Sequence, residues 1–123
     1  MALKLNNKRK VGQFYEALAA SYLEQQGLTI LTKNAHVRIG EIDLICQDKL
    51  TLVFVEVKYR RSARYGCAIE AISPQKKRKW RQAAEIWLHQ QNLTEHEWDC
   101  RFDLVAIDGD PAQITWLPNV LLE

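Results

Sequence analysis

Residues 39–46 read Ile39-Gly40-Glu41-Ile42-Asp43-Leu44-Ile45-Cys46, and residues 52–58 read Leu52-Val53-Phe54-Val55-Glu56-Val57-Lys58. In both runs apolar, mostly β-branched residues surround acids at alternate positions, and a short polar break separates the runs, as in a β-hairpin. Strands this apolar are expected to be buried on both faces of a sheet. A carboxylate in such a strand is costly unless it is paired or binds a metal. The acids are therefore the first candidates for function.

The length of the hairpin loop decides which side chains share a face of the sheet. A two-residue loop at Asp48-Lys49 would place Glu41 opposite Glu56, and a four-residue loop, 48–51, would place Asp43 opposite Glu56. An odd-length loop without a bulge would separate Asp43 from Glu56, and we expect an even one. Either even-length loop predicts one face with Glu41, Asp43, Glu56 and Lys58, and a wholly apolar face with Ile42, Leu44, Cys46, Val53, Val55 and Val57.

The acidic face has the composition of a site for a divalent cation. Carboxylates on neighbouring strands repel each other, and a bound cation reverses that interaction. Asp43, Glu56 and a nearby carbonyl form a hard oxygen site that suits Mg²⁺ or Mn²⁺. Lys58 points to the same side, where it could orient or deprotonate a water or stabilise charge on a phosphate. An Asp, a dozen residues and then Glu-x-Lys is typical of metal-dependent phosphodiester cleavage, although an isolated Glu-x-Lys is usually a solvated strand edge or an ion pair.

Length and composition indicate one globular domain. The chain has 123 residues, of which 47% are hydrophobic and 26% charged, as is usual for a soluble protein. We find no stretch of about 20 apolar residues that would span a membrane and no apolar signal region near the start. The three cysteines, Cys46, Cys67 and Cys100, are not clustered, so we expect buried thiols in a reduced compartment, the cytoplasm.

Positive charge is concentrated in two segments. Residues 58–81 contain nine Lys and Arg residues and one acid, and residues 1–10 contain four basic residues and no acid. A basic block directly after an acidic pair indicates a phosphate-rich partner, and a solvated helix face is the alternative. We expect phosphate contacts from Arg60, Arg61, Lys76 and Lys77. The two lysines fall in the first turn of a helix, where the helix dipole disfavours cations unless an anion is bound.

The remaining patterns predict an α/β fold. Residues 11–26 form an amphipathic helix that ends at Gly27, with Glu16 at the rim of its apolar face. Ser73 and Pro74 begin a second helix that runs to about residue 91 and buries a stripe from Trp80 to Leu88. Strands are expected at 28–37, in the hairpin and at 101–107, with a short edge strand at 114–117.

We therefore expect a mixed central sheet flanked by helices, in the order α-β-β-β-α-β with a tail. Residues 1–10 are expected to be a basic, flexible segment, residues 11–118 a single domain, and residues 119–123 a tail.

Five motifs, in this order, resemble those of the YraN family. They are Gly40-Glu41-Ile42-Asp43-Leu44-Ile45, Phe54-Val55-Glu56-Val57-Lys58-Tyr59-Arg60, Tyr65-Gly66, Lys76 and Arg101-Phe102-Asp103. This bacterial family, whose function is uncharacterised, is similar in fold to restriction endonucleases and archaeal Holliday-junction resolvases. The resemblance covers roughly residues 10–108. It implies a restriction endonuclease-like core with nuclease roles for Asp43, Glu56 and Lys58, a metal-site role for Glu16, and a basic residue, Lys76, opening the second helix.

The main functional hypothesis is a Mg²⁺- or Mn²⁺-dependent nuclease that acts on DNA, including branched DNA. Asp43 and Glu56 would bind the metal, Glu16 would assist, Lys58 would position the water, and Glu41 would be an auxiliary residue. The alternative is a nucleic-acid-binding module with this fold that does not cut. A third reading is a protein-interaction domain that uses Trp98 and Trp116. We expect DNA in preference to RNA as the partner and no membrane. A homodimer stays open, because nucleases that act on two strands are often dimers.

Overall fold

The computed structural model describes residues 8–61, 68–94, 96–109 and 111–121. The expected Tyr65-Gly66 motif, Arg64, Cys67, residues 1–7 and the end of the expected tail lie outside the described residues. The elements are α1 (Lys8–Gln25), β1 (Thr29–Val37), β2 (Gly40–Asp48), β3 (Thr51–Arg60), the short 3-10 helix η1 (Ala68–Ala71), α2 (Pro74–Gln90), β4 (Asp99–Asp108) and β5 (Gln113–Leu117). Helix α1 thus begins three residues before the expected start. Within the described residues, neither long helix is apolar enough to cross a membrane.

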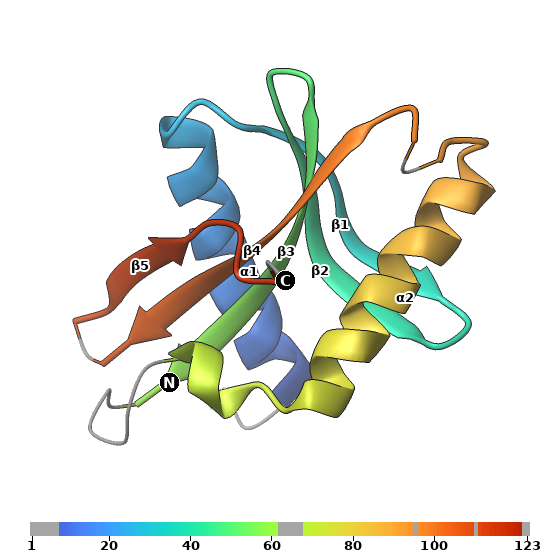
Figure 1. The fold of residues 1–123 in the computed structure, drawn as a ribbon. Coiled ribbons are helices and arrows are strands. Elements are labelled where there is room, and N and C mark those ends of the chain that lie inside the picture. The colour runs from blue at the N-terminus through green and yellow to red at the C-terminus, as the bar shows by residue number, and fades with distance from the viewer. Residues whose placement is uncertain (1–7, 62–67, 95, 110, 122–123) are drawn as a thin grey trace.

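The strands form one mixed sheet in the order β1-β2-β3-β4-β5 (Figure 1). Strands β3 and β4 are parallel and are connected through α2, and the other neighbouring pairs are antiparallel. The expected α/β class, the mixed sheet and its flanking helices are confirmed. Strand β5 is the expected short edge strand.

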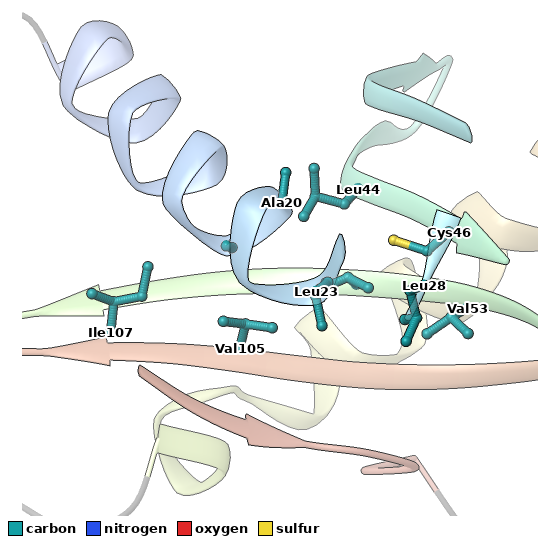
Figure 2. Packing of buried hydrophobic residues seen from close by; sticks show 10 residues of the cluster. Ala20, Leu23, Leu28, Leu44, Cys46, Val53, Val105 and Ile107 are labelled. Atoms are coloured by element: carbon teal, nitrogen blue, oxygen red, sulfur yellow. The ribbon is translucent and has the colours of Figure 1, made fainter. Parts of the chain in front are cut away.

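Helix α1 covers one face of the sheet. Figure 2 shows Ala20 and Leu23 of this helix among side chains from β2, β3 and β4. The core that they form is fully buried and includes Leu44, Cys46, Val53, Val55, Val105 and Ile107. Gly27 ends the helix with a φ of 98°, a left-handed conformation that favours glycine. The expected helix end is therefore confirmed.

Helix α2 covers the opposite face and begins as the sequence predicts. The Ser73 side chain accepts a hydrogen bond from the backbone N–H of Lys76 at 3.0 Å, and Pro74 occupies the first helical position. The apolar stripe on this helix packs against Phe54 and Ile45 of the sheet. Its most buried members are Trp80, Ala83, Ala84 and Leu88. The expected stripe is therefore confirmed.

The hairpin has an even loop, as expected, but its alternation breaks near the acids. Asp48 pairs with Thr51, and the β2–β3 ladder continues to Leu44 opposite Val55. The same register would set Asp43 opposite Glu56, although the ladder stops before that pair. Leu44 packs beneath α1, whereas Ile42 belongs to the core beneath α2. The expected single apolar face is therefore wrong at Ile42.

The physical reason for this break lies in the neighbouring strand. Asn34 stands opposite Asp43, between the pairs Lys33–Leu44 and Ala35–Ile42. It has a φ of 53°, in the left-handed region that asparagine tolerates better than most residues. A left-handed residue inside a strand interrupts the regular alternation, and the end of β2 therefore turns its side chains toward different neighbours.

A buried ionic network joins β4, β5 and the C-terminal residues. Asp103 is completely buried, and its carboxylate accepts hydrogen bonds from the Arg101 guanidinium, from Trp116 Nε1 and from the backbone N–H of Asn119. Arg101 also contacts Asp48, at 3.2 Å. Trp116 is one of the two tryptophans considered as an interaction surface. Its indole N–H is therefore used in a hydrogen bond within the fold. Trp98, the other, packs half-buried against the α2 core.

We predict that Asp103→Ala lowers the free energy of unfolding by about 3 kcal/mol or more. The substitution leaves the Arg101 charge and the Trp116 and Asn119 donors without their shared acceptor. Urea unfolding followed by tryptophan fluorescence measures the change. Asp99→Ala, at an exposed position at the start of the same strand, is the control and should cost less than about 0.5 kcal/mol. Equal losses in the two variants would contradict the role assigned to Asp103.

Candidate metal centre

Three carboxylates meet where α1 passes the first residues of β2. Glu16, Glu41 and Asp43 each offer one oxygen atom, and these oxygens lie within 4.8 Å of one another. Glu16 and Asp43 are half-buried, while Glu41 is exposed. The cluster thus combines one residue from a helix with two from a strand.

A backbone hydrogen bond holds Asp43 in this position. Asp43 Oδ2 accepts the N–H of Val57 at 2.8 Å. A side chain therefore takes a backbone donor at the point where the β2–β3 ladder has ended. This contact keeps the carboxylate at the end of the sheet, beneath α1.

Burial and mutual repulsion raise the pKa values of the cluster. Burial is the largest cause for Glu16, whose pKa rises to about 7, and the charges of Asp43 and Glu41 add to it. The pKa of Asp43 is also raised, mainly by burial, although the Val57 N–H opposes this. One Glu16 oxygen, Oε1, is buried and has no hydrogen-bond partner among the described residues. The cluster is therefore electrostatically unfavourable when fully ionised.

Glu56 lies outside this cluster and pairs with a lysine of α2. Glu56 Oε1 is 3.3 Å from Lys76 Nζ, and the Glu56 side chain is only 13% exposed. Burial and the Asp43 charge raise the pKa of Glu56 to about 7, while the charges of Lys76 and Lys58 oppose the rise. Glu41, which was expected to be an auxiliary residue, therefore lies close enough to Asp43 for both carboxylates to bind one ion. Glu56 lies outside the group of Glu16, Glu41 and Asp43.

The predicted basic residues separate into two groups. Lys76 contacts Glu56, and Lys58 is close enough for its charge to affect the same carboxylate. Arg60, in contrast, donates from Nε to Asp108 on the neighbouring strand at 2.8 Å. Arg61 is exposed where β3 ends, and Lys77 is half-buried in the first turn of α2. The structure therefore brings Lys58 and Lys76 to the acids, and it pairs Arg60 elsewhere.

A hollow of about 270 Å³ adjoins the acids on the α2 side. Glu41 and Glu56 line it together with Lys76 and Lys79. Glu41 also lines a second hollow, which contains Glu16. Glu16, Glu41 and Glu56 therefore border two depressions, and Glu41 belongs to the walls of both.

Sequence reasoning missed Asn34. Its side chain forms a hydrogen bond with Glu16 that opposes the rise in the pKa of that residue, and its backbone interrupts the alternation of β1. An asparagine inside an alternating strand is the signal that could have identified it, because this residue type favours left-handed and turn conformations.

Comparison with known proteins identifies the family. Residues 15–107 match the model described as "Uncharacterised protein family UPF0102". A UPF0102 protein of Haemophilus influenzae strain PittGG is 45% identical over 114 residues, which cover 93% of this chain and 96% of the relative. One of Vibrio campbellii is 45% identical over 97% of this chain and 98% of the relative. The chain belongs to the UPF0102 family, which confirms the YraN resemblance.

We predict that the metal-free protein loses stability as pH rises from about 5 to about 7.5. Glu16 and Glu56 have folded-state pKa values of about 7 against 4.5 for the free side chain. In this range the folded state therefore binds more protons than the unfolded state, so a rise in pH favours unfolding.

The variant Glu16→Gln isolates this effect from other titrations. Glutamine cannot ionise, so the variant should melt several degrees above the wild type near the upper pH and should differ less near the lower one. Thermal unfolding by circular dichroism in a chelator measures both. Glu85→Gln, on the exposed side of α2, is the matched control. If the difference in melting temperature between Glu16→Gln and the wild type did not change with pH, the raised pKa assigned to Glu16 would be contradicted.

Proposed function

We propose that this member of the UPF0102 family is a Mg²⁺- or Mn²⁺-dependent nuclease that hydrolyses phosphodiester bonds in DNA, with branched or otherwise structured DNA as its substrate class. The observation that carries the proposal is the group of three carboxylate oxygens within 4.8 Å of one another. Such a group is unfavourable unless protons or a cation neutralise it. Acids whose pKa values are strongly raised and which lie beside a hollow are frequent at functional sites.

The residues present fit a hard divalent cation. The donors are all carboxylate oxygens, which suit Mg²⁺ and Mn²⁺ better than Zn²⁺. The buried Glu16 Oε1, which has no hydrogen-bond partner among the described residues, is available as a ligand. Glu16, Glu41 and Asp43 would hold the ion, with Glu56 next to them. A bound ion of this kind supplies Lewis-acid chemistry, since it lowers the pKa of water and neutralises charge on a phosphate.

The surrounding residues support hydrolysis in distinct ways. The Val57 N–H fixes the orientation of the Asp43 carboxylate. Lys58, close to Glu56, would position the attacking water or stabilise the charge that develops on the phosphate. Lys76 lines the hollow and its side chain is about half-exposed, so it can bind a phosphate oxygen. Its contact with Glu56 keeps that cation beside the acids.

A binding module that does not cut is the second candidate, and one observation favours it. Lys76 Nζ lies 3.3 Å from Glu56 Oε1, so the lysine offsets the charge of this carboxylate. If that pair is permanent, Glu56 does not become a ligand, and the lysine serves only to attract phosphate. Such a module would bind nucleic acid in a salt-sensitive manner without any dependence on metal.

We predict that Asp43→Asn reduces cleavage by about 100-fold or more and weakens Mn²⁺ binding, because the amide keeps the size of the side chain but removes its charge. Isothermal titration with Mn²⁺ measures binding. Cleavage is measured on a panel of duplex, flap, single-stranded and four-way DNA. Glu85→Gln, distant on the exposed side of α2, should change neither. Cleavage that survives Asp43→Asn would remove the proposed site, and DNA affinity without Mn²⁺ binding would favour the second candidate.

The same titration ranks the other acids. Glu41→Gln should weaken Mn²⁺ binding more than Glu56→Gln, since Glu41 belongs to the close group of oxygens and Glu56 is held by Lys76. The reverse order would show that Glu56 leaves Lys76 when the metal binds.

We predict that Lys76→Gln lowers the slope of log affinity against log salt by about one unit, as expected for the loss of one phosphate contact. Fluorescence anisotropy with labelled DNA at several salt concentrations measures the slope. Arg78→Gln removes an equal charge from an exposed position on the same helix and is the control. An unchanged slope in Lys76→Gln would assign this lysine to Glu56 alone.

A further inference from the structure

Gly12 lies in the second turn of α1, where the fold does not require a glycine. Its backbone is helical and is not left-handed, and a Cβ atom built on it would have no described atom within 4 Å. Glycine inside a helix lowers stability relative to alanine. Neither backbone strain nor close packing therefore explains why position 12 is a glycine. The open space beside it suggests that a ligand passes close to the helix there.

Gly12 borders two hollows. The first has a volume of about 290 Å³ and is walled by Val11, Tyr15, Val57 and Tyr59. The second, of about 410 Å³, is walled by Arg9, Gln13, Asn34, His36 and Glu41. Lys8, Gly12 and Glu16 line both hollows. A side chain at position 12 would therefore project into open space at the border of both hollows.

The two hollows differ in chemistry. The first is apolar and aromatic: the rings of Tyr15 and Tyr59 stack with their centroids 3.8 Å apart and their planes 11° from parallel. Its volume is close to the lower end of the roughly 300–1,000 Å³ that small-ligand sites span. The second hollow is lined by polar and charged groups, with the basic Lys8 and Arg9 beside the acidic Glu16 and Glu41. A ligand that occupies both hollows would join a planar, apolar part to a polar part with an anionic group near Lys8 and Arg9.

The carboxylate cluster lies between the two hollows. Glu16 belongs to the cluster and to both walls. Val57 lines the aromatic hollow and donates its backbone N–H to Asp43. A phosphate at the cluster would therefore have the hollow of about 290 Å³ on one side and, on the other, a depression whose wall includes Lys8 and Arg9.

We propose that this surface binds an unpaired segment of a DNA strand, with one nucleobase in the aromatic hollow and the sugar-phosphate backbone crossing α1 at Gly12 toward Lys8 and Arg9. The proposal rests on the proposed function, because it shares Glu16, and it narrows the substrate to single-stranded or locally unpaired DNA. Bases stack favourably on aromatic side chains. A base within a continuous duplex would first have to leave its stack.

The test uses the full chain carrying Asp43→Asn, in a chelator, so that binding requires neither metal nor cleavage. The probe is a fluorescent oligothymidylate of about 12 nucleotides, compared with a duplex of equal length. We expect the single strand to bind about tenfold more tightly or better, and Gly12→Leu to reduce that affinity about tenfold or more. The melting temperature of Gly12→Leu should stay unchanged or rise, since leucine favours helix formation.

Matched variants separate occlusion from general damage. Ser21→Leu places the same side chain at an exposed position on α1 and should leave binding unchanged. Gly12→Ala adds only a methyl group and should give a smaller loss, and it replaces Gly12→Leu if the larger variant does not fold. Tyr59→Leu should weaken single-strand binding by removing the stacked ring. Equal affinity for duplex and single strand, or no difference between the Gly12 and Ser21 variants, overturns the proposal.

The outcome is distinguishable from failure of the nuclease proposal. Binding that depends on Gly12 in a protein that neither binds Mn²⁺ nor cuts DNA would keep the strand-binding surface and reject the enzyme. Cleavage that depends on Asp43 but is insensitive to Gly12→Leu would keep the enzyme and reject the surface.

Discussion

The hydrogen bond from the Val57 N–H to the Asp43 carboxylate is the contact on which the geometry of the site depends. It occurs where strands β2 and β3 have stopped pairing. In a regular ladder a backbone carbonyl would accept this N–H, and here the Asp43 carboxylate accepts it. The bond holds a half-buried carboxylate at the end of the sheet. Glu16 from α1 and Glu41 from β2 then share the same small volume. Without this anchor, repulsion would favour the separation of the three acids.

Two helices complete the site from opposite faces of the sheet. Figure 1 shows the first turns of α1 and α2 at the same end of the molecule. Helix α1 contributes an acid and the open space at Gly12, and α2 contributes Lys76 beside Glu56. The two apolar cores fix both helices on the sheet, and packing far from the acids therefore determines where these side chains lie. The cationic Lys76 contacts the anionic Glu56 at a position where the lysine side chain is still exposed to water.

Buried carboxylates serve two different purposes in this protein. Asp103 is fully buried, yet a guanidinium, an indole N–H and a backbone N–H satisfy it. It therefore acts as a structural connection among β4, β5 and the C-terminal residues. Glu16 is less buried but lies beside other acids, and one of its oxygens has no hydrogen-bond partner among the described residues. Whether a carboxylate has a structural or a functional role therefore depends more on its hydrogen-bond and ionic partners than on how deeply it is buried.

Local sequence signals were sufficient to predict the secondary structure and the even hairpin loop. Period-two alternation, the Ser73-Pro74 helix start and the Gly27 helix end are local signals, and local backbone preferences control them. These signals predicted the elements of the sheet and both helices, and they identified Asp43, Glu56 and Lys76 as residues near one another. The family motifs added Glu16. The resulting expectation of the fold was correct.

The grouping of these acidic and basic residues depends instead on how the helices pack on the sheet. Strict alternation predicted one face with Glu41, Asp43, Glu56 and Lys58, and it did not predict which of these acids lie closest to Glu16. In the structure, Glu41 joins Asp43 and Glu16, while Glu56 pairs with Lys76 and still has its pKa raised by the charge of Asp43. The sequence pattern carries no information on this choice, because it depends on the distances between a helix, a strand end and a second helix. Electrostatic interactions act through space, and those distances exist only after the two cores have packed.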